Sequence, residues 1–111
     1  MTDLPIEIDV QAVRQLQQQN EDFLFIDCRE PGEYETARIE GTVLIPMGEI
    51  TSRVDELAGN EEKRVVVHCH LGGRSLRVTQ WLRTNGFRNA QNMSGGIEAW
   101  SNEVDSTVPR Y

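Results

Sequence analysis

The chain has 111 residues with 11 basic and 18 acidic side chains, which give a formal net charge of −7, and 38% of its residues are hydrophobic. A chain of this length has room for one hydrophobic core, so we expect a single domain over residues 1–111 with its core at about residues 6–100. The acidic balance argues against nucleic acid as a partner, because contacts to phosphates need clustered lysine and arginine.

The amino-terminal segment, residues 1–9, carries three acidic side chains, no lysine or arginine, and no apolar run of the kind that a secretory signal needs. Nowhere does an apolar run approach the roughly 18 residues of a transmembrane helix. We therefore expect a cytoplasmic protein without membrane contact.

The first third of the chain alternates strand and helix patterns. Residues 6–8 fit a short edge strand, and Asp9 can cap a helix that ends at about residue 19. The apolar run at residues 23–26 is too short for a helix and fits a buried strand that ends at Asp27.

Further elements follow in the same alternation. In chain order we expect a loop with about one helical turn at residues 30–37, a strand at 42–45, a helix at 49–57, a strand at 65–67, a tight turn at 68–73, a helix at 74–85, a strand at 90–93, a short helix that follows Gly95 and Gly96 and ends at Trp100, and a polar tail at 101–111. This alternation predicts an α/β fold with a mainly parallel sheet and right-handed crossovers.

The charge is unevenly distributed along the chain. The stretch at residues 63–97 contains no Asp or Glu but six cationic side chains, at positions 63, 64, 74, 77, 83 and 88. Two interpretations stay open: a chance distribution of ordinary solvated helix charges, or an anion site built into an acidic body.

Reactive side chains gather at the carboxyl ends of strands in parallel sheets, and two strand ends carry them here, at residues 27–29 and 68–70. Cys69 lies between a buried strand and the sequence Leu71-Gly72-Gly73-Arg74-Ser75, where a helix begins. Backbone N–H groups and the helix dipole stabilise a thiolate in such a turn, and these sites lower a cysteine pKa from about 8.5 to about 3.5–7.5. Cys69 is therefore our candidate nucleophile.

The two cysteines are too few for a disulfide framework and lack the spacing of a zinc site. Cys28 has no glycine turn and follows Asp27, so we interpret it as structural. A disulfide between Cys28 and Cys69 becomes possible if the two strand ends are adjacent. We expect no metal and no cofactor.

Three stretches resemble the signatures of rhodanese-like domains. Residues 23–46, FLFIDCREPGEYETARIEGTVLIP, resemble the first signature, residues 69–75, CHLGGRS, the active-site loop, and residues 95–100, GGIEAW, the third. Residues 37–41 and Leu44 depart from the family pattern, which bears on the rim of the pocket and the choice of substrate. The resemblance implies a three-layer α/β domain with a mainly parallel five-stranded sheet that carries sulfur as a cysteine persulfide.

The resemblance also implies a thiosulfate sulfurtransferase activity. Cys69 would take the outer sulfur from a small anionic donor such as thiosulfate and hold it as a persulfide, which is then passed to a thiol, to cyanide or to a protein. Arg74 is expected to bind the anionic donor, because a guanidinium engages two oxygens at once. The substrate-binding loop consists of His70, Leu71, Gly72, Gly73, Arg74 and Ser75.

The neighbours of this loop are expected to support it. Arg29 would pair with Asp27 or Glu33 as a structural ion pair, and His68 would be a satisfied core histidine. Ser75 would cap the helix, with donation to the sulfur as a secondary role.

Three other functions remain open. A cysteine phosphatase or arsenate reductase has His-Cys, five residues and then Arg, whereas here only four residues separate Cys69 from Arg74. A non-enzymatic sulfur-carrier or partner-binding module would use the same fold. A redox sensor would use Cys69 together with Cys28.

Overall fold

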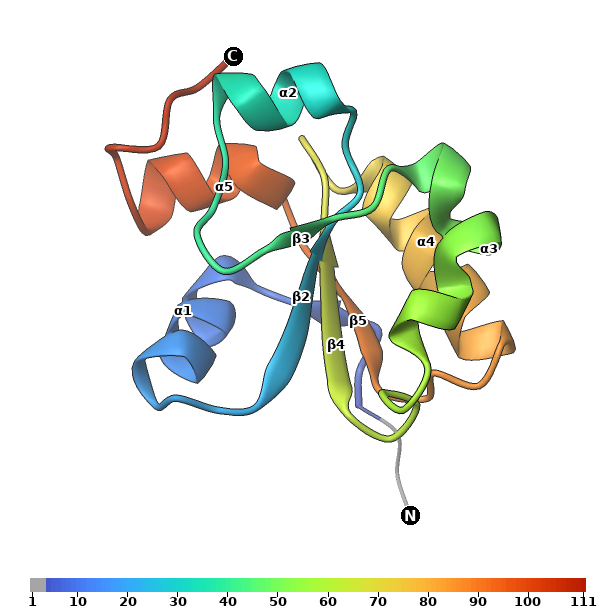
Figure 1. Cartoon of the computed structure of the whole chain (residues 1–111). Helices are drawn as coiled ribbons and strands as arrows, with labels where there is room; N and C mark the ends of the chain where they lie inside the picture. Colours follow the sequence, from blue (N-terminus) through green and yellow to red (C-terminus); the bar gives the residue numbers. More distant parts are fainter. Residues whose placement is uncertain (1–3) are drawn as a thin grey trace.

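A five-stranded parallel sheet organises the molecule (Figure 1). The computed structural model describes residues 4–111, so the first three residues of the amino-terminal segment 1–9 lie outside it. The sheet order is β1-β5-β4-β2-β3, and every neighbouring pair is parallel. The strands are β1 (Glu7–Ile8), β2 (Phe23–Asp27), β3 (Val43–Leu44), β4 (Arg64–His68) and β5 (Ala90–Met93). The expected fold class is confirmed.

Helices cover both faces of the sheet. In Figure 1, α1 and α5 lie on one side, α3 and α4 on the other, and α2 lies over the end where the strands finish. The helices are α1 (Val10–Gln18), α2 (Pro31–Thr36), α3 (Ile50–Arg53), α4 (Gly73–Thr84) and α5 (Gly96–Glu103), with 3-10 turns at Met47–Glu49 and Val54–Leu57. The domain thus has three layers.

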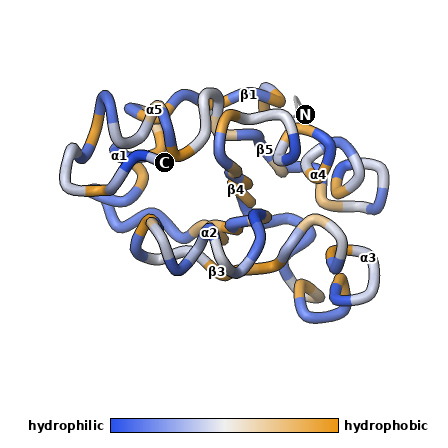
Figure 2. Tube along the Cα trace, turned by 90° about the horizontal axis from the view of Figure 1, so that it is seen from above, coloured by the Kyte–Doolittle hydropathy of each residue, from blue (hydrophilic) through white to orange (hydrophobic). Residues whose placement is uncertain are grey.

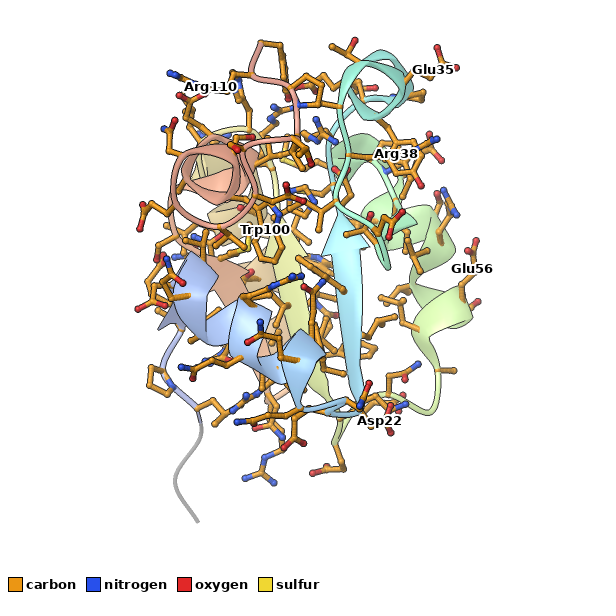
Figure 3. All side chains as sticks on the ribbon, turned by 90° about the vertical axis from the view of Figure 1, so that its left-hand side faces the viewer. Asp22, Glu35, Arg38, Glu56, Trp100 and Arg110 are labelled. Atoms are coloured by element: carbon orange, nitrogen blue, oxygen red, sulfur yellow. The ribbon has the colours of Figure 1, made fainter. Side chains whose placement is uncertain are left out.

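The central strand β4 joins the two halves of the core. Its side chains alternate between faces, as the period of two in a strand requires. Val65 and Val67 pack in the cluster on the α3 and α4 side, while Val66 packs on the α1 and α5 side with Trp100. Figure 2 shows β4 at the centre of the molecule, and Figure 3 shows Trp100 between α5 and the sheet. Burial on both faces explains the unbroken apolar run in this strand.

Two elements differ from expectation. The segment at residues 30–37 contains a six-residue helix, α2, which begins at Pro31 and is closed by a hydrogen bond from the backbone of Glu30 to the carboxylate of Glu33. The expected helix at residues 49–57 is divided into a short α-helix between two 3-10 turns. Proline at a first helical position and a carboxylate in the first turn both favour a helix start.

The carboxyl-terminal segment also differs from the expected polar tail. Helix α5 continues past Trp100 to Glu103. Val108 is then buried in the core cluster beside Ile39, and the chain ends next to α2 (Figure 1). The core therefore extends beyond residue 100.

No helix within residues 4–111 has the length and apolar character to cross a membrane.

Candidate active site

The ends of β2 and β4 lie side by side. Asp27 is in register with His68, and the backbone N–H of Cys28 donates to the carbonyl of His68 at 3.0 Å. Cys28 and Cys69 therefore follow directly on neighbouring strands, and both are buried with free thiols. Burial, with added repulsion from Cys69 and Asp27, raises the pKa of the Cys28 thiol well above its ordinary value. The adjacency that a disulfide requires is thus present, while Cys28 itself is held in its protonated form.

The turn after β4 closes around the Cys69 sulfur. Gly72 adopts a left-handed conformation (φ 114°), which only glycine takes without strain, and its N–H donates to Sγ at 3.1 Å. The backbone N–H and the hydroxyl of Ser75 lie 3.4 and 3.3 Å from the same sulfur. Burial raises the pKa of Cys69, but the hydrogen bonds of Ser75, Gly72 and Leu71 outweigh it and lower the pKa overall. The arrangement favours a thiolate.

Helix α5 holds this turn in place by hydrogen bonds to its backbone. The backbone N–H groups of Ile97 and Glu98, in its first turn, donate to the carbonyls of Cys69 and His70 at 2.9 and 3.1 Å. N–H groups at a helix start have no partner within the helix, so they are available for such contacts. Gly96 lets the helix approach the loop closely, because an added Cβ there would lie 2.4 Å from the carbonyl oxygen of His70. The third motif of the sequence therefore holds the Cys69 loop in place.

Arg74 is engaged by a carboxylate. Its two terminal nitrogens donate to Glu33 at 2.6 and 2.9 Å, from α4 across to α2. This hydrogen bonding is the main cause that lowers the pKa of Glu33 to about 2. The guanidinium expected to bind an anionic donor is therefore neutralised by Glu33, and a donor would have to compete with that carboxylate.

Tyr111 completes the rim of the site, and no local sequence pattern indicates this role. Its hydroxyl accepts from Arg29 at 3.0 Å and donates to Glu33 at 2.7 Å. Its ring stacks on His70, with centroids 4.1 Å apart and planes 14° from parallel. His70, expected in the substrate-binding loop, thus packs against a residue of the carboxyl-terminal segment.

A buried ion pair supports the floor of the site. Arg29 donates to both carboxylate oxygens of Asp27, with the shortest contact at 2.7 Å, and both side chains are fully buried. Arg29 also donates to the carbonyls of Ala37 and Glu33. The pair joins the end of β2 to α2, as the structural interpretation of Arg29 expected.

His68 is buried in the core as a neutral ring. Its Nδ1 lies 3.2 Å from the carbonyl of Cys69, and a carbonyl only accepts, so Nδ1 carries the proton. Nε2 has no hydrogen-bond partner and lies 3.6 Å from Asp27. Burial lowers the pKa of His68 to about 4, against the opposing attraction of Asp27.

This shift predicts a pH-dependent stability. Between about pH 6.5 and about pH 4 the unfolded chain binds a proton at His68 that the folded chain does not, so stability falls as the pH is lowered through this window, by up to about 1.4 kcal/mol per pH unit from this group. Urea unfolding from pH 7 to pH 4 measures the slope. A His68→Gln variant should show a smaller slope, and an unchanged slope would contradict the assignment.

The acid-free stretch does not form a single anion-binding surface. Three of its cations pair with acids from outside the stretch, and Arg83 donates to the backbone carbonyls of Leu4 and Ala90. These cations tie elements together. The paired partners are Asp22 for Lys63, Glu33 for Arg74 and Glu62 for Arg88.

Comparison with known proteins places this architecture. The family model of the rhodanese-like domain matches residues 9–103. A sulfurtransferase of Allochromatium vinosum is 33% identical over 95 residues, a match that covers 86% of this chain and 87% of that protein. The rhodanese-like/PpiC domain-containing protein 12 of Arabidopsis thaliana is 39% identical over 88 residues, or 78% of this chain.

A solved structure and the lengths of the relatives complete the comparison. The human single-domain sulfurtransferase TSTD1 has the same fold, with a TM-score of 0.81 at 23% identity over 90% of this chain and 98% of that one. The chain spans 29% of the length of the Arabidopsis relative and 52% of that of a Bacillus subtilis relative. By its family match, its motifs and its fold, the chain belongs to the rhodanese-like domain family.

Proposed function

We propose that the protein is a sulfurtransferase that carries sulfane sulfur on Cys69. The observation that carries the proposal is the convergence of the Gly72 N–H, the Ser75 N–H and the Ser75 hydroxyl on one sulfur atom. Such donors stabilise negative charge on the nucleophile and on the persulfide that replaces it. The name of the Allochromatium relative supports the same reaction class.

The reaction proceeds in two displacements. The Cys69 thiolate attacks the outer sulfur of thiosulfate, the sulfur–sulfur bond of the donor breaks, and sulfite leaves with the bonding electron pair. A nucleophilic acceptor such as cyanide or a thiolate then attacks the outer sulfur of the persulfide. The Cys69 thiolate leaves and returns to its starting state, so no cofactor or metal takes part. Cyanide leaves as thiocyanate, and a thiol acceptor becomes a persulfide.

The loop favours sulfur transfer over phosphate chemistry. Four residues separate Cys69 from Arg74, and Arg74 points to Glu33. The sixth position after the cysteine is Ser75, whose hydroxyl lies on the sulfur. A phosphate bound at the cysteine would thus lack the guanidinium that bridges its oxygens.

Thiocyanate formation from thiosulfate and cyanide tests the proposal. The wild type and the Cys28→Ser variant should turn over, because the Cys28 thiol is protonated and does not lie in the turn that closes around the Cys69 sulfur, whereas Cys69→Ser should show no turnover above background. Hydrolysis of a phosphate ester that depends on Cys69 and exceeds thiosulfate turnover would favour the phosphatase. The absence of any Cys69-dependent persulfide would favour the binding module.

Glu33 should limit the use of anionic donors. In Glu33→Gln, Arg74 loses its charged partner and becomes available to an anion, so we expect the KM for thiosulfate to fall about threefold to tenfold. The KM for cyanide, which enters after the donor has left, should change less. Steady-state kinetics measures both constants, and a rise in the KM for thiosulfate would show that Glu33 helps to bind the donor.

A further inference from the structure

A chain of polar contacts leads from the Cys69 sulfur to the surface of the protein. The Ser75 hydroxyl lies 3.3 Å from the sulfur and is also in close contact with the side-chain oxygen of Asn92. The side-chain nitrogen of Asn92 donates to the two carboxylate oxygens of Glu7 at 2.8 and 3.0 Å. Ser75 and Asn92 are buried, whereas Glu7 is exposed. These contacts connect a surface carboxylate to the buried sulfur.

Strand pairing holds Glu7 in this position. Glu7 on β1 is in register with Asn92 on β5, and directly opposed residues in a sheet place their side chains next to each other. The backbone N–H of Asn92 donates to Ile6 at 2.7 Å, and the hydroxyl of Ser94 donates to Glu7 at 3.0 Å. The contact between Glu7 and Asn92 is thus built into the edge of the sheet.

The carboxylate of Glu7 determines which groups donate and which accept along this series of hydrogen bonds. An ionised carboxylate only accepts hydrogen bonds, so the NH₂ group of Asn92 must face Glu7 and its oxygen must face Ser75. The Ser75 hydroxyl has one hydrogen, for which the Asn92 oxygen, the Gly72 carbonyl and the Cys69 sulfur compete. While this hydrogen points to Asn92, it does not point to the sulfur. The thiol form of Cys69 completes the chain, because its S–H can donate to the Ser75 oxygen.

We propose that Glu7 is a positioning residue for Cys69: its carboxylate orients Asn92, and Asn92 decides whether the Ser75 hydroxyl points toward the sulfur or away from it. With Glu7 ionised, the Asn92 oxygen competes with the sulfur for the Ser75 hydrogen, so the hydroxyl stabilises the thiolate only in part and the backbone N–H groups do the rest. When the carboxylate is neutralised, Asn92 can rotate and donate to Ser75, and the Ser75 hydrogen turns to the sulfur. Glu7 thereby restrains the reactivity of the nucleophile.

Other charged groups lie near the sulfur but are not part of the contacts that link it to Glu7. Cys28 at the end of β2 and Arg74 on α4 both interact electrostatically with Cys69. The Nδ1 of His68 contacts the carbonyl of Cys69, and His70 follows Cys69 in the loop. Within residues 4–111, the Glu7 carboxylate accepts hydrogen bonds only from the side chains of Asn92 and Ser94. A change at Glu7 can therefore be separated from the other charges by removing Ser75.

The pH dependence of Cys69 alkylation by iodoacetamide tests the proposal in the full chain. The proposal rests on the proposed role of Cys69, but the alkylation experiment needs no sulfur donor. Its outcome can therefore be interpreted even if the protein does not transfer sulfur. All variants are measured in a Cys28→Ser background. In Glu7→Gln the pH at which alkylation reaches half its maximal rate should fall by about one pH unit. The alkylation rate well below this midpoint should rise about tenfold.

A double variant separates an effect that passes through Asn92 and Ser75 from the simple loss of a negative charge at Glu7. In a Ser75→Ala background, Glu7→Gln should have no further effect, because the hydroxyl that carries the effect is gone. Glu35 is a matched control: it projects into solvent from α2 (Figure 3), and its side chain makes no hydrogen bond or ion pair within the described part of the chain, so Glu35→Gln should leave the midpoint unchanged. An unchanged midpoint in Glu7→Gln, or a shift that persists without Ser75, overturns the proposal.

Discussion

Replacing Asp27 with Asn should reduce the free energy of unfolding by about 3–5 kcal/mol, because it leaves the buried charge of Arg29 without its partner. The substitution preserves the shape of the side chain, so the loss reports charge and hydrogen bonding rather than a cavity. Asp27 and Arg29 are both fully buried, and Asp27 also accepts the backbone N–H of Arg29 at 3.0 Å. Urea unfolding at pH 7 measures the change.

An exposed ion pair supplies the control for this experiment. Arg53 and Glu56 pair at 2.9 Å on the surface, where solvent screens the interaction. Glu56→Gln should therefore give no measurable change in the unfolding midpoint. Equal losses in Asp27→Asn and Glu56→Gln would contradict the role assigned to the buried pair.

Replacing Gly96 with Ala should displace the Cys69 loop and slow the reaction, although it adds only one methyl group. Gly96 has φ 59°, and an added Cβ would lie 2.4 Å from the carbonyl oxygen of His70 and 2.5 Å from that of Cys69. These two oxygens accept the hydrogen bonds from α5 that hold the Cys69 loop. The loop must move, and displacement of a reacting atom by about 1 Å costs up to about a hundredfold in rate. We expect Cys69 persulfide formation to slow about tenfold to a hundredfold.

Gly32 is the matched control for Gly96. It lies in α2 with no atom within 4 Å of an added Cβ and without a positive φ. Gly32→Ala should keep the rate of persulfide formation and stabilise the helix by about 0.5–1 kcal/mol. Rates from rapid-mixing experiments with thiosulfate, beside the unfolding midpoints, separate damage to the loop from a general loss of stability. A Gly96→Ala variant with the wild-type rate would show that α5 does not position the loop.

The sequence predicted the parts of the site that depend on local pattern. The apolar run before Cys69, the glycines after it and the third motif are each contiguous, so they indicate the strand, the turn and the helix start directly. Local pattern also indicates the start of α2, because Pro31 and the carboxylate of Glu33 favour a helix where we expected a loop with about one helical turn.

The remaining parts of the site depend on contacts between residues that are far apart in the sequence. Glu33 and Arg74 are 41 positions apart, Tyr111 and Glu33 are 78 apart, and Asn92 and Glu7 are 85 apart. Nothing in the local periodicity of one sequence specifies such pairs. The carboxyl-terminal segment was expected to be a polar tail because its apolar side chains are isolated. Its packing arises from tertiary contacts that pattern does not report.

Intact-protein mass spectrometry after incubation with thiosulfate tests the central claim most directly. The wild type and Cys28→Ser should each gain the mass of one sulfur atom, and cyanide should remove it. Cys69→Ser should gain nothing. Gain of a sulfur atom by the Cys69→Ser variant, or by none of the three proteins, would contradict the assignment of Cys69 as the sulfur carrier.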